Sequence, residues 1–104
     1  MRSESLKGHL EGMLLSVLAR GPLHGYAVIE ELGRRSDGAL ELPEGTVYPA
    51  LHRLEAAGLL RSEWSTAEGR RRRVYALTHR GERELGSRRR EWRDFVGTIE
   101  AVMA

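Results

Sequence analysis

Residues 43–60 combine a short amphipathic helical pattern with a stop signal, and this stretch constrains the fold more than any other part of the chain. Its apolar positions follow the spacing of one helical face: Val47, Ala50, Leu51 and Leu54. Its polar side is formed by Tyr48, Pro49, His52 and Arg53. Gly58 follows where a left-handed C-terminal cap is expected. The pattern predicts a helix over about residues 46–57, buried on one side and open to a partner on the other.

Pro49 is compatible with two starts for this helix. If Thr46 is the N-cap, Pro49 occupies the third helical position, where an amide hydrogen has no acceptor within the helix. If Pro43 stands at the entry, the helix begins earlier and Pro49 lies further inside it. The sequence alone does not separate the two starts.

Patterns elsewhere predict three further helices and one hairpin. The spacing of Leu6, Leu10 and Val17 predicts a first helix over about residues 5–20, which Gly21-Pro22 ends. A second, shorter helix around residues 26–32 precedes a turn at 37–38 and an extended segment over 39–42. Strands over 60–65 and 72–77, with a turn at 66–69, form the hairpin, and Trp64 is expected to pack it onto the core. Thr78 caps a last helix that runs to the C-terminus.

The composition argues against several classes of protein. The 104 residues suit one compact unit, and the absence of cysteine excludes disulfides, thiol catalysis and cysteine-based zinc sites. No apolar run approaches the roughly 20 residues that span a bilayer, and no signal-peptide pattern is present, so we expect a soluble cytoplasmic protein.

Chemistry at a catalytic or metal centre is not indicated either. The four histidines lack the spacings of metal ligands: His9, His24, His52 and His79. Glu30 and Glu31 are adjacent, so on a helix their carboxylates point about 100° apart and make a poor acid–base pair. A phosphate-binding glycine loop and a nucleophile elbow are also lacking. We therefore expect no enzyme activity, no metal and no cofactor.

Positive charge is concentrated in a few places, although the net charge is only +2. All but one of the 17 basic residues are arginine, and four of them form one run: Arg70, Arg71, Arg72 and Arg73. Arginine binds phosphate bidentately, and a concentrated patch attracts a polyanion. Alone, such a run is more often solvated; at the tip of a hairpin beside an amphipathic helix it predicts phosphate or minor-groove contact. Because strand side chains alternate, at least one of the four must point sideways or inward.

The order of elements predicts a mainly α fold with a small β-hairpin, namely a winged helix-turn-helix followed by a C-terminal dimerisation helix. Residues 1–77 would form the DNA-binding domain and residues 78–104 the dimerisation helix. The last helix has an apolar stripe with nothing left to cover in one chain, so a second copy is the expected partner. The residues predicted at the dimer interface are Leu6, Leu10, Leu85, Trp92, Phe95, Val96, Ile99 and Met103.

With these motifs in view, the sequence resembles the PadR family of bacterial transcriptional regulators. Several segments carry the resemblance in the order found in the family: residues 21–26, 44–55, 58–60, 69–71, 74–78 and Gly81. Together they span most of the chain, and its length is similar to the subgroup with a single C-terminal helix. Pro43 departs from the pattern, because many relatives have a small polar capping residue there, which leaves the start of the third helix open.

The resemblance implies a homodimeric repressor that binds double-stranded DNA, of a kind often released from its operator by a small hydrophobic or aromatic effector. The two-fold symmetry of such a dimer predicts an inverted-repeat operator. Carried over to this sequence, the residues expected to contact DNA from the helices are Tyr26, Thr46, Tyr48, Pro49, His52 and Arg53. The wing arginines at 70–73 complete this set. An effector would bind around Trp92, Phe95 and Val96, because some short family members place a ligand-stacking tryptophan at the position of Trp92.

Two alternatives from other classes remain open at this point. The winged helix is also compatible with a protein-interaction module that never binds DNA. A small-molecule or nucleotide sensor without sequence-specific DNA binding is the second alternative. Substituting Arg70 to Arg73 with alanine separates DNA binding from the first alternative, since only DNA binding depends on these charges and on salt. Ligand quenching of Trp92 fluorescence with no effect on operator affinity would favour the second alternative.

Overall fold

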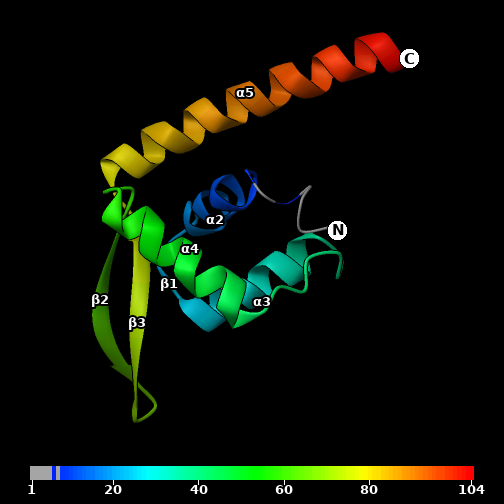
Figure 1. Cartoon of the computed structure of the whole chain (residues 1–104). Coiled ribbons are helices and arrows are strands. Elements are labelled where there is room, and N and C mark those ends of the chain that lie inside the picture. Colours follow the sequence, from blue (N-terminus) through cyan, green and yellow to red (C-terminus); the bar gives the residue numbers. More distant parts are fainter. Residues whose placement is uncertain (1–5, 7) are drawn as a thin grey trace.

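The chain folds into a helical body with a hairpin on one side and a long terminal helix on the other (Figure 1). The computed structural model describes residue 6 and residues 8–104. The elements are α2 (Leu10–Leu18), β1 (Leu23–His24), α3 (Gly25–Arg35), α4 (Glu44–Ala56), β2 (Leu60–Ala67), β3 (Arg70–Leu77) and α5 (His79–Met103). This order matches the predicted succession of helices and hairpin, with one short strand added.

A leucine-rich core holds α2, α3 and α4 together. Leu14 and Leu15 of α2, Val28 of α3 and Leu51 of α4 are fully buried in it. Tyr75 joins the same cluster from the sheet. The predicted buried stripe of α4 is confirmed, since Val47, Ala50, Leu51 and Leu54 are all at most 1% exposed. Burying this stripe fixes which side of α4 is presented to solvent.

The helix α4 begins at Glu44 with Pro43 as its N-cap, so the earlier of the two starts left open by the sequence is correct and Thr46 is not the N-cap. Pro43 has extended backbone angles, and its carbonyl accepts hydrogen bonds from the amides of Thr46 (3.0 Å) and Val47 (3.2 Å). Pro49 therefore lies inside the helix and cannot donate to the carbonyl of Gly45. Gly45 is exposed, so water can satisfy that carbonyl.

Two other expected boundaries need correction. The first predicted helix, over residues 5–20, is interrupted at Gly8, whose φ of +98° a right-handed helix does not allow, and α2 starts only at Leu10. Ser5 lies outside the described residues, whereas Leu6 is buried in the core. The expected extended segment over 39–42 forms no strand; Leu40 instead packs into the core, and its amide bonds to Ser36 Oγ at 2.9 Å.

The sheet has three antiparallel strands in the order β1-β3-β2, one more than the sequence predicted. β2 and β3 pair without interruption from Leu60 opposite Leu77 to Ala67 opposite Arg70. The turn is therefore only Glu68-Gly69, both with positive φ, and not the four residues predicted. The two-residue strand β1 pairs Leu23 with Tyr75 and joins this hairpin, here called the wing (residues 60–77), to the body.

The helix α5 is joined tightly to the end of α4 and then projects away from the body (Figure 1). Thr78 caps it as predicted, because its Oγ1 accepts from the amide of Gly81 at 3.0 Å while it donates to the carbonyl of Gly58 at 2.7 Å. Gly58 has the left-handed φ of +79° that the C-terminal cap requires. Further along, Arg88 bridges Glu84 (3.0 Å) and Glu11 of α2 (3.8 Å). These contacts orient the first half of α5.

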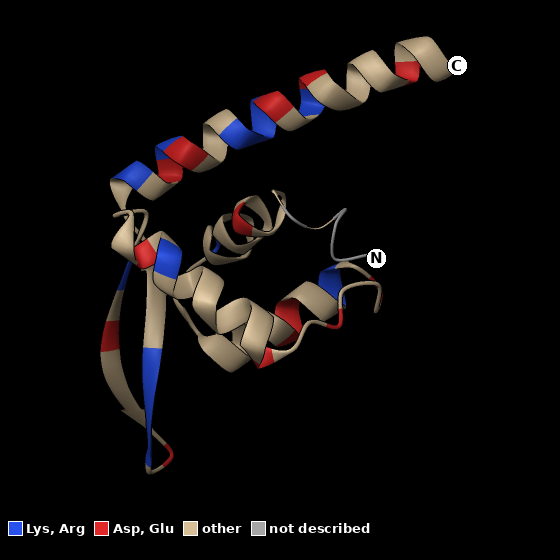
Figure 2. Ribbon diagram, in the orientation of Figure 1, with Lys and Arg blue, Asp and Glu red and all other residues tan. Residues whose placement is uncertain are grey.

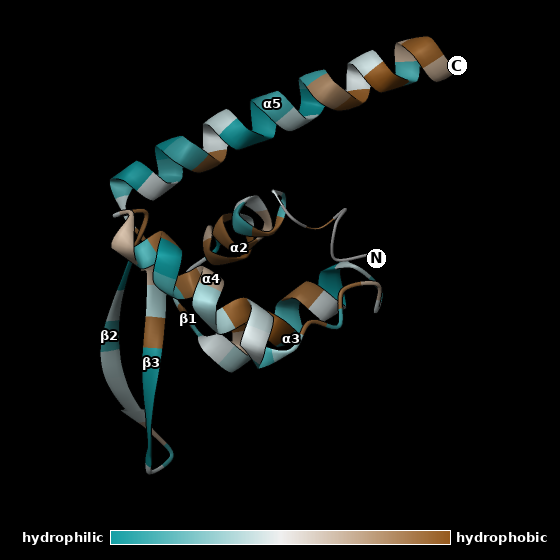
Figure 3. Ribbon diagram, viewed as in Figure 1, coloured by the Kyte–Doolittle hydropathy of each residue, from teal (hydrophilic) through white to brown (hydrophobic). Residues whose placement is uncertain are grey.

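Polar and apolar residues separate along α5. Charged residues of both signs cover its first half (Figure 2), and apolar residues dominate its last turns (Figure 3). Trp92, Phe95, Val102 and Met103 are 51–81% exposed, and Ile99 is 41% exposed. The end of α5 thus carries an uncovered apolar surface.

Candidate nucleic-acid interface

A concave surface lies between α4 and the wing. One hollow of about 550 Å³ is lined by His52, Glu55, Ala56, Trp64 and Arg73. A second, of about 430 Å³, shares three of these residues and is lined by His24, Tyr26, Tyr48, His52, Trp64, Arg70, Arg72, Arg73 and Tyr75. The structure therefore brings together six of the ten residues predicted to contact DNA, which come from α3, α4 and β3.

The other four predicted contact residues do not line these hollows. Pro49 and Arg53 are exposed on α4, and Thr46 is half-buried in its first turn. Arg71 is exposed on the wing. Because α4 buries its apolar stripe, His52 and Arg53 both face solvent, as the helical pattern predicts.

Tyr48 was expected to point outward, but it is half-buried against the core. Its ring lies so close to Gly25 at the start of α3 that a Cβ at that position would be 2.1 Å from Tyr48 Cε1. Burial raises the pKa of the Tyr48 hydroxyl, and Glu44 and Tyr26 raise it further. Tyr48 therefore remains neutral and forms part of the floor of the hollow, whereas Tyr26 is 54% exposed at its edge.

The four wing arginines fall into two groups because side chains alternate along β3. Arg72 reaches His24, with Nη1 of the arginine 3.4 Å from Nε2 of the histidine. Arg71 and Arg73 are on the other face, with their guanidinium carbons 4.5 Å and 5.4 Å from the centroid of the Trp64 ring. Figure 2 shows this basic stretch along β3 toward the tip of the hairpin. Arg70 and Arg71 are the exposed pair nearest that tip.

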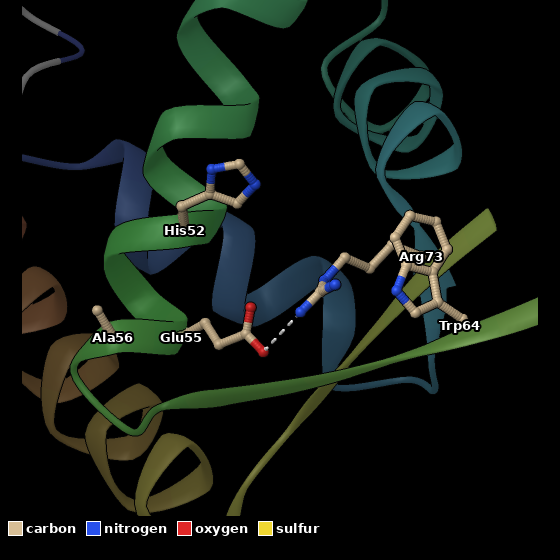
Figure 4. A pocket seen from close by; sticks show the side chains of 5 residues that line it. All are labelled: His52, Glu55, Ala56, Trp64 and Arg73. Atoms are coloured by element: carbon tan, nitrogen blue, oxygen red, sulfur yellow. Dashed lines mark ion pairs between the residues drawn. The ribbon is translucent and has the colours of Figure 1, made fainter.

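Arg73 is tied to α4 within the chain itself. Its Nη2 lies 3.8 Å from Oε2 of Glu55, and its Nε donates to Ser62 Oγ at 2.8 Å. Ser62 in turn donates to Glu55 Oε2 at 2.5 Å. Figure 4 shows Glu55 and Arg73 joined across the gap between α4 and the wing. This network links α4 to the wing through the Glu55 carboxylate.

The prediction that Trp64 packs the wing onto the core is wrong. Trp64 is 53% exposed and stands in the hollow beside Arg73, on the side that faces α4 (Figure 4). The register pairs it with Arg73, and its neighbours Glu63 and Ser65 are exposed. Strand alternation alone gave no sign of this, because both faces of β2 are mostly polar beyond Leu60. Trp64, Glu55 and Ser62 make contacts at this site that the sequence did not reveal, and His24, Ala56 and Tyr75 also line the hollows without having been predicted.

The residues predicted for dimerisation and effector binding fall into two sets. Trp92, Phe95, Ile99 and Met103 are exposed on α5, with Val96 half-buried beside them. The Trp92 ring meets His9 edge-on at 5.1 Å and Phe95 at 6.0 Å. Leu6, Leu10 and Leu85 are instead 4–8% exposed in the core of their own chain, which leaves little of their surface for a partner to cover.

Two further findings concern the described residues as a whole. Within residues 6 and 8–104, histidine, aspartate and glutamate side chains do not gather into any group of three that would suit a metal ion. Over the same residues, none of the helices combines the length and apolar character needed to cross a membrane.

Comparison with known proteins agrees with this geometry. The chain matches the transcriptional regulator PadR-like family over residues 14–87. The transcriptional regulator Rv3488 of Mycobacterium tuberculosis is 43% identical over 77 residues, covering 74% of this chain and 69% of the relative. A transcriptional regulator from Clostridium thermocellum superposes with a TM-score of 0.88 at 26% identity, covering 97% of this chain and 99% of that one. A PadR family regulator from Eggerthella lenta gives a TM-score of 0.82 at 32% identity, covering 96% and 86%.

These matches cover both α4 and the wing, and they confirm the winged helix-turn-helix fold predicted from the sequence. Proteins of this family are DNA-binding regulators of transcription and not enzymes. By its sequence over residues 14–87 and by its fold, this chain belongs to the PadR-like family of transcriptional regulators.

Proposed function

We propose that this protein is a homodimeric, ligand-responsive repressor that binds an inverted-repeat operator through α4 and the wing. The observation that carries the proposal is the concave surface that the polar side of α4 shares with the basic strand β3. In a winged helix, the reader helix enters the major groove while the wing contacts the flanking backbone or minor groove. The reader contacts are His52 and Arg53, and the phosphate contacts are Arg70, Arg71 and Arg72.

Dimerisation is supported by the uncovered apolar end of α5. A contiguous apolar patch on the surface of a soluble protein commonly marks an interaction site, such as a protein–protein interface. A two-fold pair of α5 helices would cover Trp92, Phe95 and Ile99 and set the distance between the two reader helices. That distance fixes the spacing of the operator half-sites.

The effector site lies at the same helix pair. Trp92 and Phe95 present flat apolar surface on an open helix, so a ligand would need walls from both chains. A ligand between the two α5 helices would change their angle, and the reader helices would move with them because Thr78 and Gly58 join α5 directly to α4. Repression would then fall when the effector binds.

The proposal is tested by selecting genomic fragments that the protein binds and then footprinting them. We expect protected half-sites related by two-fold symmetry, with centres about one helical turn, or roughly 10 base pairs, apart. Sedimentation should give a mass near twice the 11.7 kDa of one chain. Failure to enrich any duplex would support one of the two alternatives without DNA binding, and a monomer at micromolar concentration would refute the role of α5.

A further inference from the structure

Trp64 is a large apolar side chain in an unusual place. It is 53% exposed, yet it lines both hollows between α4 and the wing. Figure 4 shows its ring in the gap opposite His52 and Glu55 of α4. An exposed tryptophan in a concave, cation-rich surface is typical of a contact residue and not of a packing residue.

The geometry of the winged helix indicates what enters this gap. When α4 lies in a major groove and the wing reaches the adjacent minor groove, the strand that separates the two grooves must pass between them. We propose that Trp64 is a DNA-contact residue whose indole packs against a deoxyribose of that strand. This inference rests on the proposed DNA-binding function and adds a contact that does not depend on base sequence.

The charged residues around Trp64 make the gap compatible with a sugar–phosphate chain. Arg71 and Arg73 lie over the indole, at 4.5 Å and 5.4 Å, and restrict its orientation. Glu55 is the carboxylate in the gap, and its bonds to Arg73 and Ser62 compensate its charge. Arg73 is thereby occupied, and Arg71 is the cation beside Trp64 that remains available for a phosphate.

The first test separates a sugar contact from an ionic one. Trp64→Ala should weaken binding to a mixed-sequence duplex roughly tenfold, Trp64→Phe should restore most of the affinity, and neither should change the slope of log affinity against log salt. As a control, Arg71→Ala should lower that slope by about 1. Unchanged affinity in Trp64→Ala would overturn the inference, and so would a loss accompanied by a lower slope, because Trp64 would then act through Arg71.

The second test follows the two tryptophans separately, with Trp92 as the reference because it lies on α5 and lines neither hollow. Trp92→Phe leaves Trp64 as the only tryptophan, and Trp64→Phe leaves Trp92. Saturation with a mixed-sequence duplex of about 30 base pairs at low salt should protect Trp64 from acrylamide quenching and leave Trp92 unchanged. Equal quenching of Trp64 with and without bound DNA would overturn the inference about Trp64 but not the DNA-binding function. Wild-type protein that binds no duplex would refute the DNA-binding function as well.

Discussion

Gly81, in the first turn of α5, packs against the backbone of Leu59 just after α4. Substituting Gly81 therefore tests the close packing of α5 on the end of α4. A Cβ at Gly81 would lie 2.1 Å from the carbonyl oxygen of Leu59 and 3.1 Å from its carbonyl carbon. Leu59 cannot move freely, because its amide bonds to Leu54 (3.0 Å) and its carbonyl accepts from Thr78 (3.1 Å). The added methyl group therefore meets backbone that is held on both sides.

The size of the effect follows from two opposing terms. Overpacking costs about 1–3 kcal/mol or more, whereas alanine gains up to about 1 kcal/mol over glycine within a helix. For Gly81→Ala the clash should dominate, because the neighbour is backbone. Gly97→Ala is the matched control in the same helix, since nothing lies within 4 Å of its Cβ position. It should gain about 0.5–1 kcal/mol.

Urea and thermal unfolding followed by circular dichroism measure both variants, at one protein concentration because the proposed dimerisation would make stability depend on concentration. We expect Gly81→Ala to be less stable than Gly97→Ala by about 1–3 kcal/mol, or roughly 4–15 °C in Tm for a chain of this size. If Gly81→Ala matched the wild type, or equalled Gly97→Ala, the close packing of α5 on the end of α4 would be refuted.

Three further substitutions test other parts of the structure. Gly25→Ala places a methyl group against the ring of Tyr48, so it should lower the free energy of unfolding by about 1–3 kcal/mol and weaken duplex binding; unchanged urea midpoint and affinity would contradict this contact. Hydrogen bonds from two arginines one turn along α3 lower the pKa of Glu31 from 4.5 to about 2. The stability that Glu31 adds over Glu31→Gln should thus be complete above about pH 4.5 and disappear as the pH falls through about 2, and an NMR titration midpoint near 4.5 would exclude the pairing. Arg73→Ala leaves Glu55 uncompensated in the gap and should weaken duplex binding roughly fivefold, with most of the loss recovered in the Glu55→Gln, Arg73→Ala double variant. A double variant that stays weak would mean that Arg73 contacts phosphate directly.

Periodicity predicted the helices and the hairpin because burial enforces it. The apolar side chains of α4 can be buried together in only one orientation of the helix, and in that orientation His52 and Arg53 face outward. The ends of elements were less predictable, because they depend on single backbone conformations. Gly8 adopts positive φ and breaks the first helix, whereas Pro43, whose side chain cannot form a cap, still starts α4 through its carbonyl.

The interior of the interface was not predictable from local patterns. Trp64 contacts Arg71 and Arg73 only because β2 and β3 pair in one register, and the hydrogen bond that Ser62 donates to Glu55 depends on how close the wing lies to α4. These contacts join separate elements, so no spacing within one element reveals them. The arginine run itself was visible, but its division into paired and exposed side chains was not.

The central claim, that α4 reads bases while the wing holds phosphate, is tested most directly by measuring affinity for the selected operator and for a mixed-sequence duplex over a range of salt. We expect Arg70→Ala with Arg71→Ala to weaken both complexes and to lower the salt slope by about 2. We expect Arg53→Ala mainly to remove the preference for the operator, by about 1–3 kcal/mol if the arginine binds guanine bidentately. Equal losses on both duplexes for every variant, or no dependence on the wing arginines, would contradict these roles of α4 and the wing.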